Sequence, residues 1–247
     1  MRKIEFIVDN NKLQGTVISP QKLLGKNPAI LFVHGWTSHK KRSYQYAEGL
    51  AKLGYLSLLF DMRGHGESEG DINKALIKEF LDDVLAAFDY LSKLEGVDKD
   101  DISVVGSSFG SYLGALLTTK RKVKSLSLRV PADYRDEDFN KSKMQRSGSE
   151  NPEIVAWRAK PKKPDETYAL KAINDFNGKV LIIESELDDV VPHQTIQNYI
   201  DAVKDKRNLT HIVMKNAPHS TSEGPFRDQV EQILVDWFGE NNRAEFV

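Results

Sequence analysis

The sequence predicts an α/β fold with a mostly parallel, eight-stranded sheet and helices on both faces. Short apolar runs alternate along the chain with longer amphipathic runs, as expected for strands joined by helices. Most of the short runs lack polar alternation, which is typical of strands covered on both faces. The expected strands span residues 4–8, 13–18, 29–33, 55–60, 102–105, 123–128, 180–183 and 209–213. The first two flank a polar turn and are expected to form an antiparallel pair.

The predicted helices rest on apolar residues that recur every 3.6 positions. The clearest run extends from Ile77 to Leu91, with Gly96 placed to end it. Similar runs predict helices over 226–237, 111–119 and 43–53, and another helix is expected to start near Pro192. No internal repeat is present. We therefore expect a single domain over residues 1–247.

Composition excludes several classes of function. The 247 residues carry a formal net charge of −1, which gives no electrostatic reason to expect a nucleic acid partner. The absence of cysteine excludes a disulfide framework, a cysteine metal site and a thiol nucleophile. Glu5 and Asp9 interrupt the apolar start of the chain, and no run is long enough for a membrane span. A cytoplasmic protein is expected, and nothing in the sequence indicates an oligomeric state.

Residues 131–166 break the alternation of strands and helices. The segment is highly charged, contains four prolines and shows no sustained period. A loop of this length is usually functional or disordered. Because strands and helices resume after it, we interpret it as a small cap insertion above one sheet.

The candidate nucleophile is Ser108. It is the central residue of the motif Gly106-Ser107-Ser108-Phe109-Gly110, which follows one expected strand and precedes an expected helix. This strand–turn–helix context fits the G-x-S-x-G turn, which exposes a serine hydroxyl at the end of a strand and directs the first helix amides at a developing oxyanion. The alternative interpretation is a glycine–serine loop that only caps the helix.

A serine nucleophile needs a histidine base and an orienting acid, which follow it along the chain in this motif. Of six histidines, only His193, His211 and His219 come after Ser108, and His219 alone lies in a loop after an expected strand. The alternative for His219 is a surface loop residue. The candidate acid is Asp188, which follows the strand over 180–183, with Asp189 as the substitute.

A second amide donor for the oxyanion should come from the loop after the strand over 29–33. Trp36 supplies the best-placed N–H, together with that of Phe109, and Gly35 lets the backbone approach a substrate closely. His34 is interpreted as a buried structural residue that braces the turn.

These motifs together resemble the α/β-hydrolase superfamily, and most closely its small esterase, monoglyceride-lipase-like and serine-aminopeptidase-like branch. The resemblance rests on residues 34–36, 61–68, 106–110, 188–192 and His219. It implies that Asp61, Arg63 and His65 brace a turn and have no catalytic role. Some members place the acid one strand earlier, which makes Asp133 a less favoured alternative. Two residues depart from the usual pattern, which has histidine at Ser107 and glycine at Ser185.

The resemblance implies a serine hydrolase that cleaves carboxylic esters through an acyl-enzyme, without metal or organic cofactor. Tyr134, Phe139, Met144 and Trp157 in the insertion are candidates to line a pocket for a short-chain or aromatic acyl group, or else form the insertion's own small core. A peptidase or thioesterase with the same triad is the nearer alternative. A peptidase acting on free N-termini needs paired carboxylates, which Glu137 or Asp138 could supply. A catalytically silent binding protein is the more distant alternative.

Overall fold

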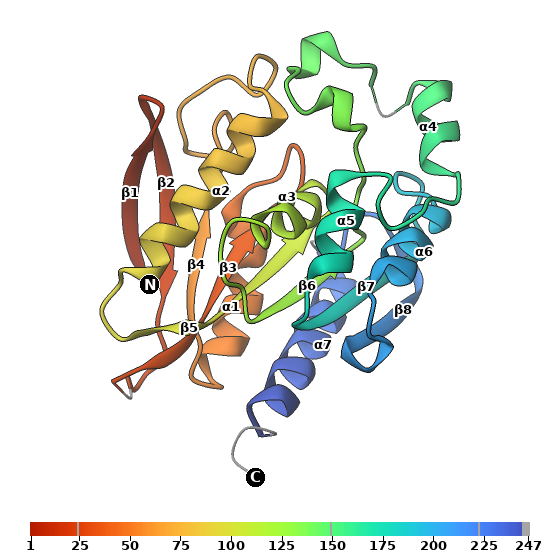
Figure 1. Ribbon diagram of the computed structural model, residues 1–247. Helices are drawn as coiled ribbons and strands as arrows, with labels where there is room; N and C mark the ends of the chain where they lie inside the picture. The colour runs from red at the N-terminus through yellow and green to blue at the C-terminus, as the bar shows by residue number, and fades with distance from the viewer. Residues whose placement is uncertain (24, 149, 222, 244–247) are drawn as a thin grey trace.

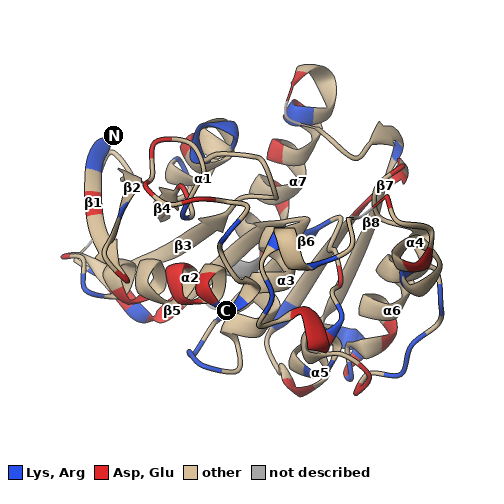
Figure 2. Ribbon diagram, turned by 90° about the horizontal axis from the view of Figure 1, so that it is seen from above, with Lys and Arg blue, Asp and Glu red and all other residues tan. Residues whose placement is uncertain are grey.

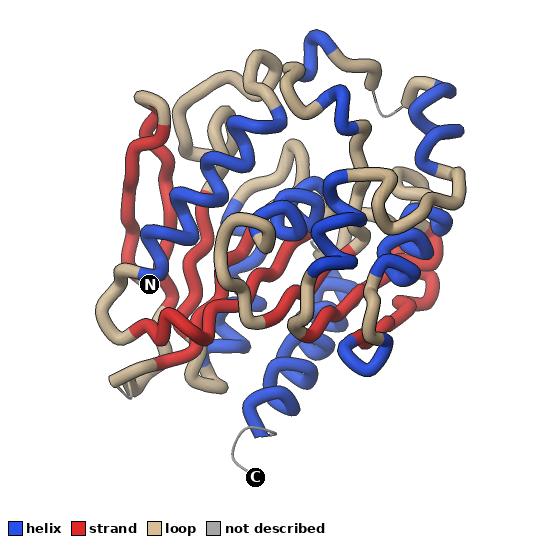
Figure 3. The backbone as a smooth tube through the Cα atoms, viewed as in Figure 1, coloured by secondary structure: helices blue, strands red, loops and turns tan. Residues whose placement is uncertain are grey.

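The eight strands of the chain form one sheet in the order β1-β2-β4-β3-β5-β6-β7-β8 (Figures 1 and 3). The computed structural model describes residues 1–23, 25–148, 150–221 and 223–243. The strands are β1 Arg2–Val8, β2 Asn11–Ile18, β3 Asn27–Val33, β4 Leu56–Phe60, β5 Val97–Ser107, β6 Ser125–Arg129, β7 Lys179–Leu187 and β8 Leu209–Pro218. The pairs β1–β2 and β2–β4 are antiparallel and all others are parallel, which confirms the predicted mostly parallel sheet.

Helices cover both faces of this sheet, as predicted (Figure 1). The helices are α1 Tyr44–Ala51, α2 Ile77–Ser92, α3 Phe109–Leu117, α4 Pro152–Arg158, α5 Tyr168–Asp175, α6 His193–Ala202 and α7 Gly224–Arg243. Apolar residues of α2, α3, α5 and α6 pack in one core cluster with one face of the sheet. Those of α1 and α7 pack in a second cluster on the opposite face.

The central strands supply both core clusters because neighbouring side chains of a strand point to opposite faces. In β3, Leu31 and Val33 join the first cluster, whereas Ile30 and Phe32 join the second. All four are buried. This explains why the sequence of β3 is uniformly apolar.

Two boundaries near the carboxyl end of the sheet differ from the prediction. The helix expected over 111–119 begins at Phe109, because the N–H groups of Ser111 and Tyr112 bond to the Ser108 carbonyl oxygen at 3.0 and 3.2 Å. The strand expected over 123–128 instead spans Ser125–Arg129 and ends on a charged residue that the apolar pattern did not include.

The segment from 131 to 166 lies above the sheet and contains the short helix α4 and two 3-10 turns (Figure 1). Helix α5 follows it and begins with Thr167, whose hydroxyl accepts the Leu170 N–H at 3.3 Å. Positive and negative residues are interspersed over the molecule (Figure 2). Within the described residues, no helix is both long and apolar enough to cross a membrane.

Candidate functional site

Ser108 occupies the one-residue turn between β5 and α3. Its backbone lies at φ 53° and ψ −113°, in a region that residues other than glycine rarely adopt. The turn is fixed from the neighbouring strand, because the Ser108 N–H donates to the Arg129 carbonyl oxygen at 2.9 Å. A strained residue held this firmly at the end of a central strand is typical of a functional position.

The two glycines of the motif are required by close packing around Ser108. A methyl group at Gly106 would lie 2.6 Å from the Gly110 carbonyl oxygen, and one at Gly110 would lie 2.1 Å from that of Val33. Real side chains do not approach backbone atoms so closely. The spacing of the motif therefore follows from the sharpness of the turn.

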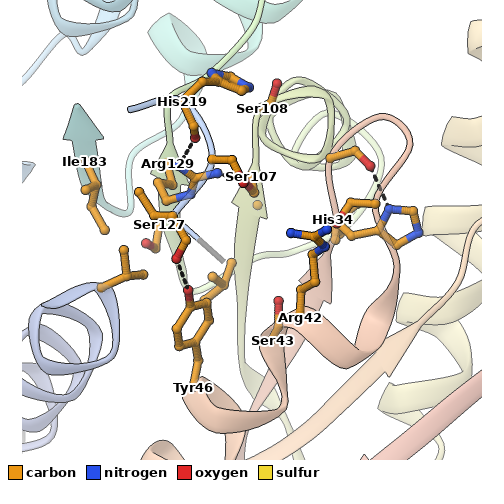
Figure 4. Close-up of a pocket in the computed structure, with 18 of the residues that line it drawn as sticks. His34, Arg42, Ser43, Tyr46, Ser107, Ser108, Ser127, Arg129, Ile183 and His219 are labelled. Atoms are coloured by element: carbon orange, nitrogen blue, oxygen red, sulfur yellow. Dashed lines mark hydrogen bonds between the residues drawn. The ribbon is translucent and has the colours of Figure 1, made fainter. Parts of the chain in front are cut away.

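His219 and Asp188 form a hydrogen-bonded pair at the ends of two adjacent strands. Asp188 follows β7, His219 follows β8, and the His219 Nδ1 atom lies 2.9 and 2.7 Å from the two carboxylate oxygens. The carboxylate also accepts the N–H groups of Val190 and Val191 at 2.9 and 2.8 Å, which fixes its orientation. Figure 4 shows the His219 ring beside the Ser108 hydroxyl, and both residues line the same cavity.

Trp36, in the loop after β3, packs against the start of α3. Its ring lies 5.3 Å from that of Phe109 in a T-shaped arrangement. The next residue in the loop, Thr37, donates its N–H to His65 Nε2 at 3.3 Å. The loop that carries one candidate amide donor is thus held against the residue that carries the other.

The turn from 61 to 68 braces this loop, as the resemblance implied. Asp61 accepts the backbone N–H and the ammonium group of Lys40 at 2.6 and 2.5 Å, and Arg63 forms a buried ion pair with Asp83 at 2.6 Å. Burial lowers the pKa of His34 to about 3, so its ring is neutral at physiological pH and accepts the Met62 N–H at 3.1 Å. His34 is therefore structural.

Comparison with known proteins agrees with this geometry. The family model described as "alpha/beta hydrolase fold" matches residues 28–147, which include Trp36 and the whole Ser108 turn. The structure of Est1E from Butyrivibrio proteoclasticus with ferulic acid bound superposes with a TM-score of 0.73 over 96% of this chain and 98% of its own, at 20% identity. The chain has the α/β-hydrolase fold.

Two other similar proteins are named as a thioesterase and as a thiohydrolase. The palmitoyl-protein thioesterase ABHD10, mitochondrial, of Pongo abelii is 26% identical over 222 residues, which cover 82% of this chain and 70% of the relative. The thiohydrolase aneE of Aspergillus aculeatus is 30% identical over 142 residues, covering 55% of this chain and 44% of the relative.

The other carboxylates near the candidate site have different positions and partners. Asp189 is exposed. Asp133 is buried and accepts the N–H of Tyr134 at 3.0 Å, and burial raises its pKa to about 6. Glu184, which no motif marked, contacts His193 and lies 2.9 Å from His211 Nε2. The carboxylate that contacts His219 is instead that of Asp188.

A cavity of about 240 Å³ opens beside Ser108, between the carboxyl ends of the strands and helices α1 and α7 (Figure 4). Its most polar wall contains Arg129, whose guanidinium donates to Ser107 Oγ at 2.6 Å and to the His219 carbonyl oxygen at 2.8 Å. No sequence motif marks Arg129, although an arginine that ends a central strand is a usable signal.

A second cavity, of about 160 Å³, lies under the insertion and shares Trp36 with the first. Tyr134 and Trp157 line it, as expected for a pocket. Phe139 instead packs against the Tyr168 ring at 5.7 Å, and Met144 is 74% exposed; neither lines either cavity. Arg146 lies over the Tyr134 ring at 5.7 Å, so this pocket is strongly charged. No group of side chains in the described residues is arranged to hold a metal ion.

Proposed function

We propose that this protein is a serine hydrolase that cleaves carboxylic esters, with Ser108 as nucleophile, His219 as base and Asp188 as orienting acid. The observation that carries the proposal is the meeting of three strand ends. A strained serine after β5 shares one cavity with a histidine after β8, and that histidine is bonded to a carboxylate after β7. This is the arrangement that acyl transfer by a serine requires.

The hydrogen bonds define the role of each group in the proposed mechanism. The His219 Nδ1–H donates to Asp188, so Nε2 is left to accept the Ser108 proton while Oγ forms a bond to the substrate carbonyl carbon. The N–H groups of Trp36 and Phe109 stabilise the oxyanion. His219 then protonates the leaving alcohol as its bond to carbon breaks. A water molecule, deprotonated by His219, then attacks the acyl carbon. The bond to Ser108 Oγ breaks, the acid is released, and His219 returns a proton to Oγ.

The two cavities favour a short acyl group over a long lipid chain. The cavity beside Ser108 is smaller than typical sites for drug-sized ligands, which occupy ~300–1,000 Å³. The second cavity has Asp133, Arg146 and Arg158 in its walls, which a long alkyl chain would leave unsolvated.

Thioesters are the second candidate substrate class, because a relative that matches 82% of this chain is named a palmitoyl-protein thioesterase and another a thiohydrolase. Peptidase activity has less support. Glu137 and Asp138, considered for a substrate ammonium group, already form ion pairs with Arg135 at 3.6 Å and Lys141 at 3.1 Å.

Labelling with a fluorophosphonate probe tests the nucleophile directly. We expect the wild type to be labelled and Ser108→Ala not to be. Ser92→Ala, which removes a hydroxyl bonded to the Asp89 carbonyl oxygen at the end of α2, is a matched control and should label like the wild type. Equal labelling of Ser108→Ala, or none of the wild type, would refute the assignment. Parallel assays with p-nitrophenyl butyrate, butyryl-coenzyme A and an aminoacyl anilide separate esterase, thioesterase and peptidase.

A further inference from the structure

Strand β6 places polar side chains on the face of the sheet that α1 and α7 cover, where buried serines of β5 and β7 also lie. Leu126 and Leu128 belong to the core cluster under α2 and α3. Because side chains alternate along a strand, Ser127 and Arg129 point to the opposite face, where both line the cavity beside Ser108. The neighbouring strands β5 and β7 present Val105 and Ile183 to that face. The polar side chains of Ser127 and Arg129 therefore line the cavity between the apolar side chains of Val105 and Ile183.

Arg129 lines this cavity without a direct ion-pair partner among the described residues, although the Asp188 carboxylate is near enough to raise the pKa of the guanidinium against the effect of burial. Its two hydrogen bonds go to neutral acceptors, Ser107 Oγ and the His219 carbonyl oxygen, and no Asp or Glu of the described residues forms an ion pair with it. Burial lowers the pKa of this guanidinium. A guanidinium has five N–H donors, so these two bonds leave donors for a ligand.

The rest of the cavity wall is also suited to a negative charge. Arg42 lines the cavity from the turn before α1, together with the hydroxyl groups of Ser43, Tyr46 and Thr221. Figure 4 shows Arg42 and Arg129 on opposite sides of the end of β5. The described lining includes no Asp or Glu. Arg129 is half-buried and Arg42 is exposed. Arginines bind carboxylates strongly because two parallel N–H groups match the two carboxylate oxygens.

We propose that this cavity binds a carboxylate group of the substrate, so that the preferred substrates are short esters or thioesters that carry a second, free carboxylate. This inference rests on the proposed function, since it places the scissile carbonyl at Ser108. The small volume of the cavity restricts the carboxylate to a position a few bonds from that carbonyl. Arg129 then determines specificity, and it also positions Ser107 and the His219 loop.

The test compares matched charged and neutral substrates within each variant. For the acyl side the pair is mono-p-nitrophenyl glutarate and p-nitrophenyl pentanoate. For the alcohol side it is 3-carboxy-4-nitrophenyl butyrate and p-nitrophenyl butyrate. We expect the wild type to prefer the charged member of one pair by at least tenfold in kcat/KM, and the responding pair identifies the part of the substrate that enters the cavity. Arg129→Gln should reduce the ratio to about one, mainly through KM, and Arg129→Lys should restore part of it.

The ratio separates recognition from a purely structural role, because damage to the Ser108 turn slows both members of a pair equally. Arg121→Gln is the control for net charge and should leave the ratio unchanged. It removes a charge that follows α3 and pairs with Asp89 of α2, on the opposite face of the sheet from the cavity. The proposal is overturned if the wild type shows no preference, if Arg129→Gln keeps it, or if Arg146→Gln in the second cavity abolishes it instead. In these cases Ser108 still labels and neutral esters are still cleaved, so the proposed function survives.

A measurement on the wild type covers the case in which Arg129→Gln does not fold. Free glutarate should inhibit hydrolysis of p-nitrophenyl butyrate competitively, and glutaramide, which has the same shape without charge, should be at least tenfold weaker. Equal inhibition by the two compounds, or none by either, would overturn the proposal.

Discussion

Asp188 and Asp189 are adjacent in the chain, but His219 donates its hydrogen bond to Asp188. Asp188 bonds to the imidazole and to two backbone N–H groups, whereas Asp189 is exposed. The pairing of β7 with β8 is irregular between Ser185 and Leu187, just before this loop. An irregularity of this kind changes which side chain points to a given side. The order of residues predicted an acid here, and this local geometry favours Asp188.

We predict that Asp188→Asn lowers kcat for p-nitrophenyl butyrate by about 10⁴-fold, because an amide stabilises the wrong imidazole tautomer. Asp189→Asn preserves the same shape at an exposed position and should stay within about twofold of the wild type. Steady-state kinetics of the two variants measure both effects. The opposite pattern would reassign the acid to Asp189.

Arg129 illustrates the limit of motif analysis at the scale of residues. No sequence pattern links it to Ser108, since the two residues are separated by helix α3. Its place beside the turn comes from the parallel pairing of β5 with β6, which sets Ser107 opposite Arg129. Ser107 stands where the resembling family usually has histidine, and its hydroxyl accepts the hydrogen bond of that arginine.

At the scale of elements, the turn between β5 and α3 depends on the contact of the helix start with β3. Gly110 lies against the Val33 carbonyl oxygen, which cannot move without displacing the strand. Gly114, one turn later, faces only a Val104 methyl group, at 3.2 Å. The two glycines of α3 therefore differ in function although both are buried in the same helix.

This difference predicts opposite outcomes for two similar substitutions. Gly110→Ala should lower the free energy of unfolding by about 3 kcal/mol, because the added methyl overlaps backbone atoms. Gly114→Ala should change it by less than about 1 kcal/mol, since the helical preference of alanine offsets a mild contact. Urea unfolding followed by circular dichroism measures both. Equal destabilisation would contradict the role assigned to Gly110.

The sequence predicted the elements well where a strand or helix repeats its apolar pattern. Helix α2 begins at Ile77 as expected, and all eight strands are present. Helices α4 and α5 were not predicted. Both are short, and α4 lies in a charged segment where only Ile154 and Arg158 of its residues are buried. Because α4 has no wide apolar stripe, its fold depends on tertiary contacts that periodicity does not contain. Helix α5 does bury an apolar face, but it has only eight residues in which to repeat the pattern.

At the scale of the whole molecule, stability depends on pH through buried ionisable groups. Burial raises the pKa of Asp133 to about 6, above its unfolded value of ~3.9. Between about pH 4 and 6 the folded state therefore keeps a proton that the unfolded chain has lost. Folding stability consequently decreases as the pH rises through this window, and the cost persists above it.

Asp133→Asn should remove this dependence. Relative to the wild type, the variant should gain about 2–3 kcal/mol in free energy of unfolding between pH 4 and pH 7.5. Urea unfolding at the two pH values measures the gain. If the difference between variant and wild type is the same at both, the Asp133 carboxylate is not protonated in the folded protein within this window.

The order β5-β6-β7-β8 has a consequence for how such a protein can change during evolution. Ser108, Asp188 and His219 come from loops far apart in the chain, and they meet because their strands end at the same edge of one sheet. Recombination that exchanges a single segment cannot carry the site with it. Exchange of the insertion between β6 and α5, in contrast, leaves every one of those strand ends in place. New specificities are therefore most accessible through that segment, while the reaction itself is inherited only with the complete sheet.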